Sequence, residues 1–441
     1  MRAWRGRFVQ YGARHGMAGG GRMEYGLIGA KLKHSFSKEI HEKLTDYTYD
    51  LCPLASTADV AAFLCEKQFK AVNITIPYKE FVLPFCDIID DRAKEIGAVN
   101  TVVNRGGTLY GYNTDFAGFL YLVQANQISL ADKTVLILGT GGTQKTVEAA
   151  AKSAGAKQIL RASRTKTAAT LTYEQAAARR DVQIVVNTSP VGMYPQNGAC
   201  LLDLSGFPLL EAVLDAVYNP LETRLLWQAR QRGVKAANGL LMLVAQAKFA
   251  AEYFLDTSFP DSEISRIAAE IRIQRANLVL IGMPGSGKSV LGKRCAALLC
   301  KEWVDLDDAV EARANSTIAA LFASQGEDAF RALEHAVCAE VSKETGLVIS
   351  TGGGIVKNDD NVRLLRQNGS IIFIDRAPET LATGGARPLS QNADAVQKLY
   401  AQRLPLYRAA ADSTVENSGS LSAVSAKIKE AFHEIARLER T

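Results

Sequence analysis

Short apolar runs alternate with amphipathic stretches along most of this chain. Runs such as Tyr25–Gly29, Thr134–Leu138 and residues 278–281 are bounded by turn-forming residues and have the length of buried strands. Stretches such as Ser37–Leu44 and residues 146–154 instead show the spacing of helices with one buried face. Regular alternation of strands and helices predicts an α/β protein with parallel strands.

The same pattern divides the chain into three α/β units. We expect the first to span residues 23–110 and to be completed by a helix at residues 240–256. The second, residues 111–239, opens with a strand, a glycine turn, an Ala-rich helix and a strand, which is how a Rossmann domain begins. A linker that contains a helix start follows at residues 257–276, and residues 277–441 form the third unit. Further strands are expected at residues 71–76, 158–162, Ile184–Asn187 and Ala212–Asp215.

Length and composition fit this division. A chain of 441 residues exceeds one ordinary core, since domains average roughly 150 residues. A hydrophobic share of 47% and a charged share of 22% describe a globular protein with material for several cores. No uninterrupted apolar stretch approaches the roughly 20 residues that span a bilayer, so the sequence predicts no membrane partner.

The net charge of +5 is confined to an N-terminal leader. Residues 1–22 contain five arginines and no acidic residue, which leaves 46 Lys and Arg to balance 46 Asp and Glu in the remainder. A balanced body lacks the basic surface that nucleic-acid binding needs, so no nucleic-acid partner is expected. For the leader we favour a disordered extension, or a start codon placed too early with Met23 as the true start, over a transit peptide.

Cysteine usage indicates the compartment. The seven cysteines are an odd number without a CxxC pair. This argues against a disulfide framework or a zinc site. We therefore expect a reducing, cytoplasmic location.

A glycine-rich loop follows the apolar run Thr134–Leu138. Its sequence, Gly139-Thr-Gly141-Gly142-Thr143, lets the backbone approach a pyrophosphate at the start of a helix, although Gln144 stands where the usual fingerprint has a third glycine. The next strand ends in Ser163-Arg164-Thr165-Lys166, where an NAD enzyme usually has an acid. A guanidinium and a hydroxyl suit an anionic 2′-phosphate, so the sequence predicts NADP(H).

Six separated motifs resemble shikimate dehydrogenase over residues 24–256. They are His34-Ser35-Phe36-Ser37, Asn73-Ile-Thr75-Ile-Pro77-Tyr-Lys79, Gly97-Ala-Val-Asn100-Thr101, Gly111-Tyr-Asn113-Thr114-Asp115, Asp215-Ala-Val-Tyr218-Asn-Pro220 and Gly239-Leu-Leu-Met-Leu-Val-Ala-Gln246. The resemblance implies a substrate-binding α/β domain joined to a Rossmann NADP-binding domain. One departure is Lys38, which stands where the family usually has Pro and offers an extra positive charge near the expected carboxylate site.

The same resemblance implies residue roles. Lys79 is the implied acid/base, working beside Asp115, because a ketone that accepts a hydride needs a proton donor at the developing alkoxide. Ser35 and Ser37 would bind the substrate carboxylate. The remaining implied substrate-binding residues, most of them at ring hydroxyls, are Thr75, Asn100, Asp115, Tyr218 and Gln246. The implied cofactor-binding residues are Gly139, Gly141, Gly142, Thr143, Ser163, Arg164, Thr165 and Gly239.

A second phosphate-binding loop follows residues 278–281. Gly282-Met-Pro-Gly285-Ser286-Gly287-Lys288-Ser289 is a complete Walker A sequence between a predicted strand and a predicted helix. Its backbone N–H groups cradle the phosphates of ATP, Lys288 reaches the β- and γ-phosphates, and Ser289 ligates Mg²⁺.

The residues downstream of this loop resemble shikimate kinase from residue 277 to about residue 435. The matching motifs are Trp303-Val-Asp305-Leu-Asp307, Phe330-Arg331, Gly352-Gly353-Gly354, Arg387-Pro388-Leu389 and Arg403-x-Pro405-x-Tyr407. The resemblance implies a P-loop domain with a parallel sheet between helices. It also implies that Asp305 supports Mg²⁺, that Asp307 binds the acceptor hydroxyl as a base, and that Arg387 lies on a mobile lid over the transferred phosphoryl group. Arg331 and Arg403 would hold the carboxylate, and Gly353 would line the acceptor site.

Together the two halves predict a bifunctional enzyme. The first half would reduce 3-dehydroshikimate to shikimate with NADPH, and the second would phosphorylate shikimate at its 3-hydroxyl with ATP and Mg²⁺. One alternative makes the first half a catabolic quinate or shikimate dehydrogenase, which would more often use NAD. A distant alternative is a non-catalytic regulator built from the same domains. The sequence leaves the oligomeric state open.

Overall fold

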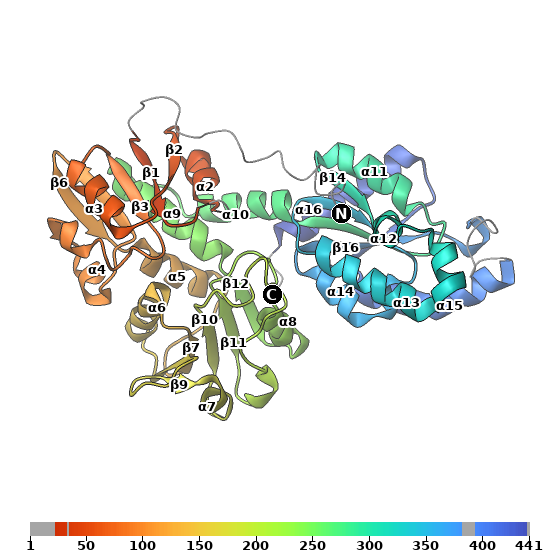
Figure 1. The fold of residues 1–441 in the computed structure, drawn as a ribbon, viewed down its shortest axis with the longest axis horizontal. Helices are drawn as coiled ribbons and strands as arrows, with labels where there is room; N and C mark the ends of the chain where they lie inside the picture. Colours follow the sequence, from red (N-terminus) through yellow and green to blue (C-terminus); the bar gives the residue numbers. More distant parts are fainter. Residues whose placement is uncertain (1–22, 33–34, 382–392, 439–441) are drawn as a thin grey trace. The chain divides into compact units, whose positions relative to one another are not determined.

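The computed structural model describes residues 23–32, 35–381 and 393–438 (Figure 1). Among these, residues 23–218 and 223–268 form one compact unit, and residues 219–222 and 269–438 form a second. The division after Ala268 falls inside helix α10 (Ser262–Arg275). Within the described ranges no helix is both long and apolar enough to cross a membrane.

The first sheet of the first unit is mixed. Its strand order is β2-β1-β3-β5-β6-β4, with β1, β2 and β3 parallel and β5 antiparallel to both β3 and β6. The strands are β1 (Tyr25–Gly29), β2 (Tyr49–Pro53), β3 (Ala71–Ile74), β4 (Ile88–Ile89), β5 (Thr101–Arg105) and β6 (Thr108–Tyr112). The helices around it are α2 (Ser37–Leu44), α3 (Thr57–Glu66), the 3₁₀ turn η1 (Leu83–Phe85), α4 (Asp91–Ile96) and α5 (Thr114–Ala125).

Both faces of this sheet are buried. Successive strand residues point to opposite sides, and each side packs into a core of its own. In β1, Ile28 packs into a core with Val60 and Leu64 of α3. The alternate residue Leu27 packs into a second core that contains Phe254 of α9 (Leu240–Leu255). Helix α9 therefore returns late in the chain to cover the first sheet, beside α5 and α2 (Figure 1).

The second sheet has six parallel strands in the order β12-β11-β10-β7-β8-β9. Numbered from β7, this is the Rossmann order, with the direction of winding changing between β7 and β10. The strands are β7 (Thr134–Leu138), β8 (Gln158–Ser163), β9 (Leu171–Thr172), β10 (Ile184–Asn187), β11 (Ala212–Asp215) and β12 (Lys235–Asn238). The connecting helices are α6 (Gly142–Ser153), α7 (Tyr173–Ala177), η2 (Leu204–Gly206) and α8 (Arg224–Gln231).

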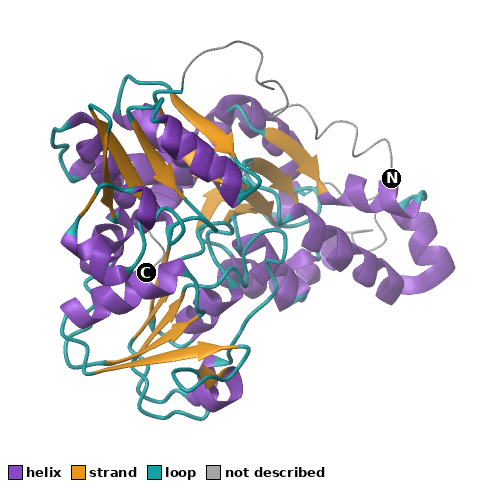
Figure 2. Ribbon diagram, turned by 60° about the vertical axis from the view of Figure 1, so that its left-hand side comes forward, coloured by secondary structure: helices purple, strands orange, loops and turns teal. Residues whose placement is uncertain are grey.

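The second unit contains one five-stranded parallel sheet in the order β14-β15-β13-β16-β17. Alternate residues of β13 enter two different cores, Val279 on one face and Leu280 on the other, so helices cover both faces. Figure 2 shows the strands of the chain in orange among helices in purple. The strands are β13 (Asn277–Ile281), β14 (Glu302–Asp305), β15 (Leu347–Ser350), β16 (Gly369–Asp375) and β17 (Ser413–Glu416). The helices are α11 (Lys288–Leu299), α12 (Leu306–Ala314), α13 (Ile318–Val341), η3 (Ile355–Lys357), α14 (Asp359–Arg366), η4 (Pro378–Thr380), α15 (Ala393–Ala410) and α16 (Leu421–Arg437).

The α/β class is confirmed, while several predicted boundaries change. The helix expected at residues 146–154 begins at Gly142, because the end of the glycine loop is already its first turn. The strand expected at residues 71–76 ends at Ile74, where a turn closed by Tyr78 N–H and Thr75 O leads away from the sheet. The boundary expected at residue 111 falls inside β6, since Gly111 pairs with Val102 of the first sheet. Most of the expected linker at residues 257–276 is helix α10.

Candidate active sites

Lys79 and Asp115, the expected acid–base pair of the first unit, come from two segments that are distant in sequence. Lys79 lies in the turn region after β3, and Asp115 lies in the first turn of α5. The Lys79 ammonium donates to a carboxylate oxygen of Asp115 at 2.6 Å, and the two side chains are 14% and 9% exposed. Burial of both groups together keeps the ammonium oriented, since water competes little for either partner.

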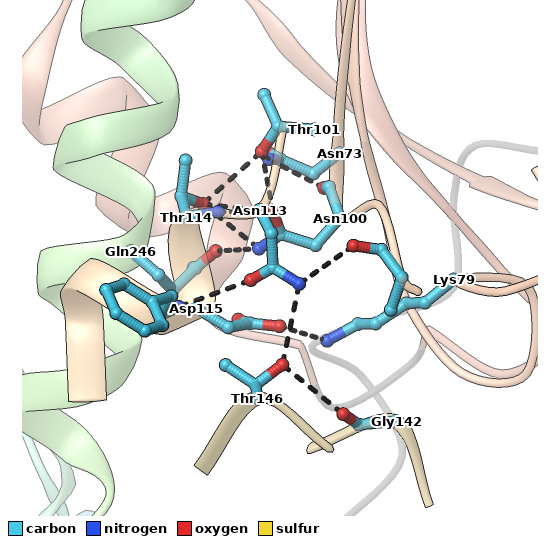
Figure 3. A network of polar contacts seen from close by, with 12 residues as sticks. Asn73, Lys79, Asn100, Thr101, Asn113, Thr114, Asp115, Gly142, Thr146 and Gln246 are labelled. Carbon is cyan, nitrogen blue, oxygen red and sulfur yellow. Dashed lines mark hydrogen bonds and ion pairs between the residues drawn. The ribbon is translucent and has the colours of Figure 1, made fainter. Parts of the chain in front are cut away.

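A buried polar network holds Asn100 next to this pair (Figure 3). The Asn100 side-chain oxygen accepts from the backbone N–H of Thr114 at 2.7 Å and from the Thr101 hydroxyl at 3.0 Å. Its side-chain nitrogen donates to the Thr114 hydroxyl at 3.0 Å and to the Gln246 side-chain oxygen at 3.4 Å. Asn100, Asp115 and Gln246 are thereby brought together from the residue before β5, from α5 and from α9.

Close contact between α5 and α9 makes this grouping possible. A Cβ on Gly118 would lie 2.8 Å from the backbone oxygen of Met242 and 3.0 Å from the Cβ of Gln246. Glycine therefore lets the two helices approach until Gln246 reaches Asn100. Gly239 acts similarly at the start of α9, where a side chain would collide with the backbone of Ala216.

Asn113 is a polar residue of this site to which the sequence analysis gave no role. Its side-chain oxygen caps α5 by accepting from Phe116 N–H at 3.2 Å. Its side-chain nitrogen donates to Ala98 O at 2.9 Å and to the Thr146 hydroxyl of α6 at 3.4 Å. The residue thus joins the helix that carries Asp115 to the helix that follows the glycine loop (Figure 3).

The two serines expected at the carboxylate end lie together at the start of α2. The Ser35 hydroxyl is 3.1 Å from the Ser37 hydroxyl and accepts from Ser37 N–H at 3.2 Å. The extra charge of Lys38 is not directed at a ligand, because its ammonium donates to Glu42 at 2.6 Å and to Tyr49 O at 2.7 Å. Tyr218 reaches the same end of the site, with its ring 5.1 Å from that of Phe36.

Thr75 and Tyr218 are fixed by the strands that precede them. Thr75 N–H donates to Ile28 O at 2.8 Å, which ties it to β1. Before Tyr218, the buried Asp215 accepts from Thr223, Asn187 and Val217 N–H at 2.7, 2.9 and 3.0 Å. Burial raises the pKa of Asp215 to about 7 against the opposing effect of these three donors.

The glycine loop of the Rossmann sheet lies at the change of winding direction, between β7 and β10. Gly139 has a φ of 113°, which other residues rarely adopt, and a Cβ there would lie 3.0 Å from the Thr188 hydroxyl that follows β10. Gly141 caps α6, and Gly142 and Thr143 form its first turn. An added Cβ on Gly142 would lie 3.8 Å from the Lys79 side chain, so the glycine loop and the Lys79–Asp115 ion pair are neighbours.

The residues expected at a 2′-phosphate stand at the end of β8. Ser163 donates to Thr165 O at 2.5 Å and shapes the turn, while Arg164 and Thr165 are exposed. Glycines at the start of a helix and an exposed cation after the next strand fit a phosphorylated dinucleotide.

The P-loop of the second unit wraps around the ammonium group of Lys288. Gly285 and Gly287 have φ of 81° and 93°, which allows the loop to curl before α11 starts at Lys288. The buried Lys288 donates to the carbonyl oxygens of Gly282 and Met283 at 3.0 and 2.9 Å. The buried Ser286 hydroxyl has no hydrogen-bond partner among the described residues, which fits a loop built to receive phosphate oxygens.

Asp305 and Asp307 flank the end of β14. The Ser289 hydroxyl donates to Asp305 at 2.6 Å, and the other oxygen of Asp305 accepts from Asp307 N–H at 3.0 Å. Burial raises the pKa of Asp307 to about 6, and the charge of Asp305 adds to this while Lys288 opposes it. A hydroxyl and a carboxylate in contact at this position are oxygen ligands of the kind that Mg²⁺ prefers.

Three residues expected to bind the phosphoryl acceptor, Arg331, Gly353 and Arg403, lie together at the glycine-rich segment after β15. Gly353 O accepts from Arg403 at 2.8 Å and from Tyr407 at 2.6 Å. A Cβ on Gly354 would lie 2.6 Å from the Arg331 guanidinium, so the glycine leaves room for that group. Arg331 comes from α13 and Arg403 from α15, and the two cations converge on one small region.

Glu334 is a further residue of this site that the sequence analysis missed. It accepts from Arg331 at 2.8 Å through one oxygen and is only 3% exposed. Its other oxygen has no hydrogen-bond partner among the described residues, and a Cβ on Gly352 would lie 3.3 Å from it and 2.6 Å from Asp307. Two carboxylates therefore face the space beside Gly352. Arg387, expected on the lid, lies outside the described residues.

Comparison with known proteins matches each of the two units to a family. The family profile described as shikimate dehydrogenase substrate binding domain matches residues 27–102, and the profile described as shikimate kinase matches residues 284–433. The shikimate dehydrogenase (NADP(+)) of Clostridium perfringens strain 13 is 34% identical over 266 residues, which cover 56% of this chain and 98% of that protein.

Solved structures support the first of these matches. Shikimate dehydrogenase 1 from Peptoclostridium difficile is 31% identical with a TM-score of 0.53, covering 57% of this chain and 97% of that one. Shikimate 5-dehydrogenase from Thermus thermophilus, in complex with NADP(H) and shikimate, is 31% identical with a TM-score of 0.51, covering 56% and 99%. The chain therefore belongs to the shikimate dehydrogenase family and continues into a shikimate kinase domain, which makes it a bifunctional enzyme of the shikimate pathway.

Proposed function

We propose that the first unit reduces 3-dehydroshikimate to shikimate with NADPH and that the second converts shikimate to shikimate 3-phosphate with ATP and Mg²⁺. The observation that carries the first half is the buried Lys79–Asp115 pair, 2.6 Å apart and adjacent to the glycine loop. Separate steady-state assays of the purified chain with each acceptor test the two activities. A chain that fails to oxidise NADPH with 3-dehydroshikimate, or to form ADP with shikimate, would lack the corresponding function.

In the dehydrogenase reaction, Lys79 supplies the proton. NADPH, when bound, provides the hydride that reduces the ketone. The Lys79 ammonium transfers a proton to the oxygen on which negative charge develops, and its positive charge stabilises that oxygen before transfer. Asp115 orients Lys79. Asn100 and Gln246, which lie 3.4 Å apart, would hold ring hydroxyls and so present the reacting carbon to the hydride donor. Ser35, Ser37 and Tyr218 fix the carboxylate end, and Thr75 adds a hydroxyl contact.

We propose NADP(H) as the dinucleotide, with Arg164 and Thr165 binding the 2′-phosphate. Both residues are exposed at the end of β8, where an NAD-binding Rossmann domain carries an acid. This favours biosynthetic reduction over the catabolic alternative, an oxidation of quinate or shikimate by NAD. The phosphate-binding backbone is supplied by residues 139–143, and Gly239 keeps the start of α9 close to β11.

Replacing Arg164 with Ala is expected to raise the KM for NADPH about 10- to 100-fold while leaving the KM for NADH within about twofold. One charge-assisted hydrogen bond to the 2′-phosphate accounts for a difference of this size. Both constants come from initial rates with 3-dehydroshikimate. The neighbouring Lys166→Ala variant serves as the matched control and should change the NADPH constant less. Equal effects on both nucleotides, or a wild-type preference for NADH, would contradict this role.

In the kinase reaction, the chain mainly positions groups and neutralises charge. ATP, when bound with Mg²⁺, provides the phosphoryl group that is transferred. Backbone N–H groups of Gly285, Ser286 and Gly287 would hold phosphate oxygens, and Lys288 would turn from loop carbonyls to those oxygens. Ser289 and Asp305 would carry Mg²⁺. Arg387 remains a proposed lid residue.

The acceptor would lie between Asp307 and the two arginines. Asp307 would accept the proton of the attacking hydroxyl, and Arg331 and Arg403 would hold the carboxylate by charge-assisted hydrogen bonds. Gly353 would line the site, with its carbonyl oxygen fixing Arg403.

Seven free cysteines support a cytoplasmic, reducing location.

A further inference from the structure

Tyr49 of β2 is a buried residue that neither set of site motifs includes. Its side chain is 0% exposed, and its hydroxyl donates to the side-chain oxygen of Asn73 at 2.7 Å. Its ring stacks on the His41 imidazole of α2, with centroids 4.1 Å apart and planes at 8°. A tyrosine placed so deeply needs a partner for its hydroxyl, and here the partner is a side chain of the adjoining network.

The hydrogen bond from Tyr49 fixes which way the Asn73 side-chain amide is oriented, and with it the order of donors and acceptors in the network. Because the Asn73 oxygen accepts from Tyr49, its nitrogen faces the Thr101 hydroxyl at 3.1 Å. The Thr101 hydroxyl can then direct its single proton to the Asn100 side-chain oxygen at 3.0 Å. With its oxygen occupied, Asn100 directs its nitrogen to the Thr114 hydroxyl at 3.0 Å and to the Gln246 side-chain oxygen at 3.4 Å (Figure 3).

The backbone of Tyr49 is joined to the other end of the site. Lys38 donates to Tyr49 O at 2.7 Å, and Tyr49 N–H donates to Glu42 at 3.2 Å. Lys38 and Glu42 are themselves paired at 2.6 Å on α2, the helix that begins with Ser37. Tyr49 therefore touches both the helix of the carboxylate-binding serines and the network that ends at Asn100.

We propose that Tyr49 is a positioning residue that fixes the orientation of the Asn100 carboxamide through Asn73 and Thr101. The inference rests on the proposed role of Asn100 in holding a ring hydroxyl. Thr114 N–H also holds the Asn100 oxygen, at 2.7 Å, so loss of the Tyr49 hydroxyl weakens the orientation without abolishing it. Loss of the Tyr49 hydroxyl should therefore weaken substrate binding, since the Lys79–Asp115 pair is not part of the relay of hydrogen bonds from Tyr49 to Asn100.

Tyr49→Phe is expected to raise the KM for 3-dehydroshikimate about tenfold and to leave the KM for NADPH within about twofold. Tyr47→Phe is the matched control. Tyr47 belongs to the same aromatic cluster, but its hydroxyl is hydrogen-bonded to His41 at 2.7 Å, whereas the Tyr49 hydroxyl is bonded to Asn73. It should remain within about twofold of wild type. An unchanged KM for NADPH reports that the first unit is folded, and shikimate kinase activity on the same preparation reports that the second unit is intact.

Thr101 variants test the relay independently of Tyr49. Thr101→Val, which removes the hydroxyl, should raise the substrate KM as much as Tyr49→Phe does, and Thr101→Ser should restore it. The Tyr49→Phe/Thr101→Val double variant should be no worse than Thr101→Val alone, because both changes break one chain of bonds. If Tyr49→Phe does not fold, the Val and Ser variants at position 101 still decide the matter.

Three results would overturn the inference. These are an unchanged substrate KM in Tyr49→Phe, equal effects of the Tyr47 and Tyr49 changes, and losses that multiply in the double variant. A wild-type chain that does not reduce 3-dehydroshikimate at all would instead remove the proposed dehydrogenase function, and the inference with it. The wild-type assay thus separates the two failures.

Discussion

Replacing Lys79 with Met is expected to lower kcat for 3-dehydroshikimate reduction by about 10²- to 10⁴-fold. The substitution keeps an unbranched side chain of nearly the same length but removes both the transferable proton and the positive charge expected at the developing alkoxide. The buried Asp115 loses its partner at 2.6 Å, which makes the site more negative just where negative charge must be accommodated. The measurement is the initial rate of NADPH oxidation at saturating 3-dehydroshikimate.

The control for this variant is a lysine of the same unit that lies outside the site. Lys70 is 59% exposed and pairs with Glu24, so Lys70→Met should keep wild-type kinetics. Shikimate kinase activity of the Lys79→Met chain should be unchanged, because Lys288 and its loop are untouched. A Lys79→Met enzyme within about threefold of wild type would show that the proton comes from another group.

Replacing Lys288 with Met is expected to lower kcat for shikimate phosphorylation by about 10²- to 10³-fold and to raise the KM for ATP. In the structure the ammonium group is held by the carbonyl oxygens of Gly282 and Met283, in the centre of the P-loop. Its removal leaves the negative charge of the phosphates without a fixed cation. Positioning and neutralising that charge are the main contributions of protein groups to phosphoryl transfer. ADP formation with shikimate as acceptor provides the measurement.

Lys427 on the exposed side of α16 offers the matched control, and Lys427→Met should retain full kinase activity. NADPH oxidation by the Lys288→Met chain should equal that of wild type. Normal kinase activity in Lys288→Met would contradict the assignment of this loop as the ATP site. Parallel loss of both activities would indicate a folding defect in place of a local one.

Much of the fold could be predicted because its strands are buried on both faces. Strands β1 and β7 match their predicted bounds, since continuous apolar runs between turn residues leave little ambiguity. The start of α6 was predicted four residues late. Glycine is a poor helix former, so Gly142 suggested a loop, yet the same residue begins α6 and lies in its first turn.

The supporting residues of the sites were harder to predict. Glu334, three residues after Arg331 on a helix, has the spacing of an ordinary surface ion pair, and only packing at the end of the sheet buries it to 3%. Asn113 stands within a recognised motif but was given no role, although its amide joins α5 to α6. Lys38 suggested an extra positive charge near the substrate carboxylate, but Glu42, one helical turn away, pairs with it. Each outcome depends on contacts between segments, which local patterns do not contain.

A coupled assay of the purified wild-type protein shows whether one chain catalyses two consecutive steps. The protein is supplied with 3-dehydroshikimate, NADPH, ATP and Mg²⁺, and both cofactors are followed. We expect ADP to appear after NADPH oxidation begins and to approach the amount of NADPH consumed, and we expect no ADP when NADPH is omitted unless shikimate is added. NADPH oxidation that is never followed by ADP formation, or ADP formation that does not depend on NADPH or shikimate, would mean that the chain does not catalyse the two steps in sequence.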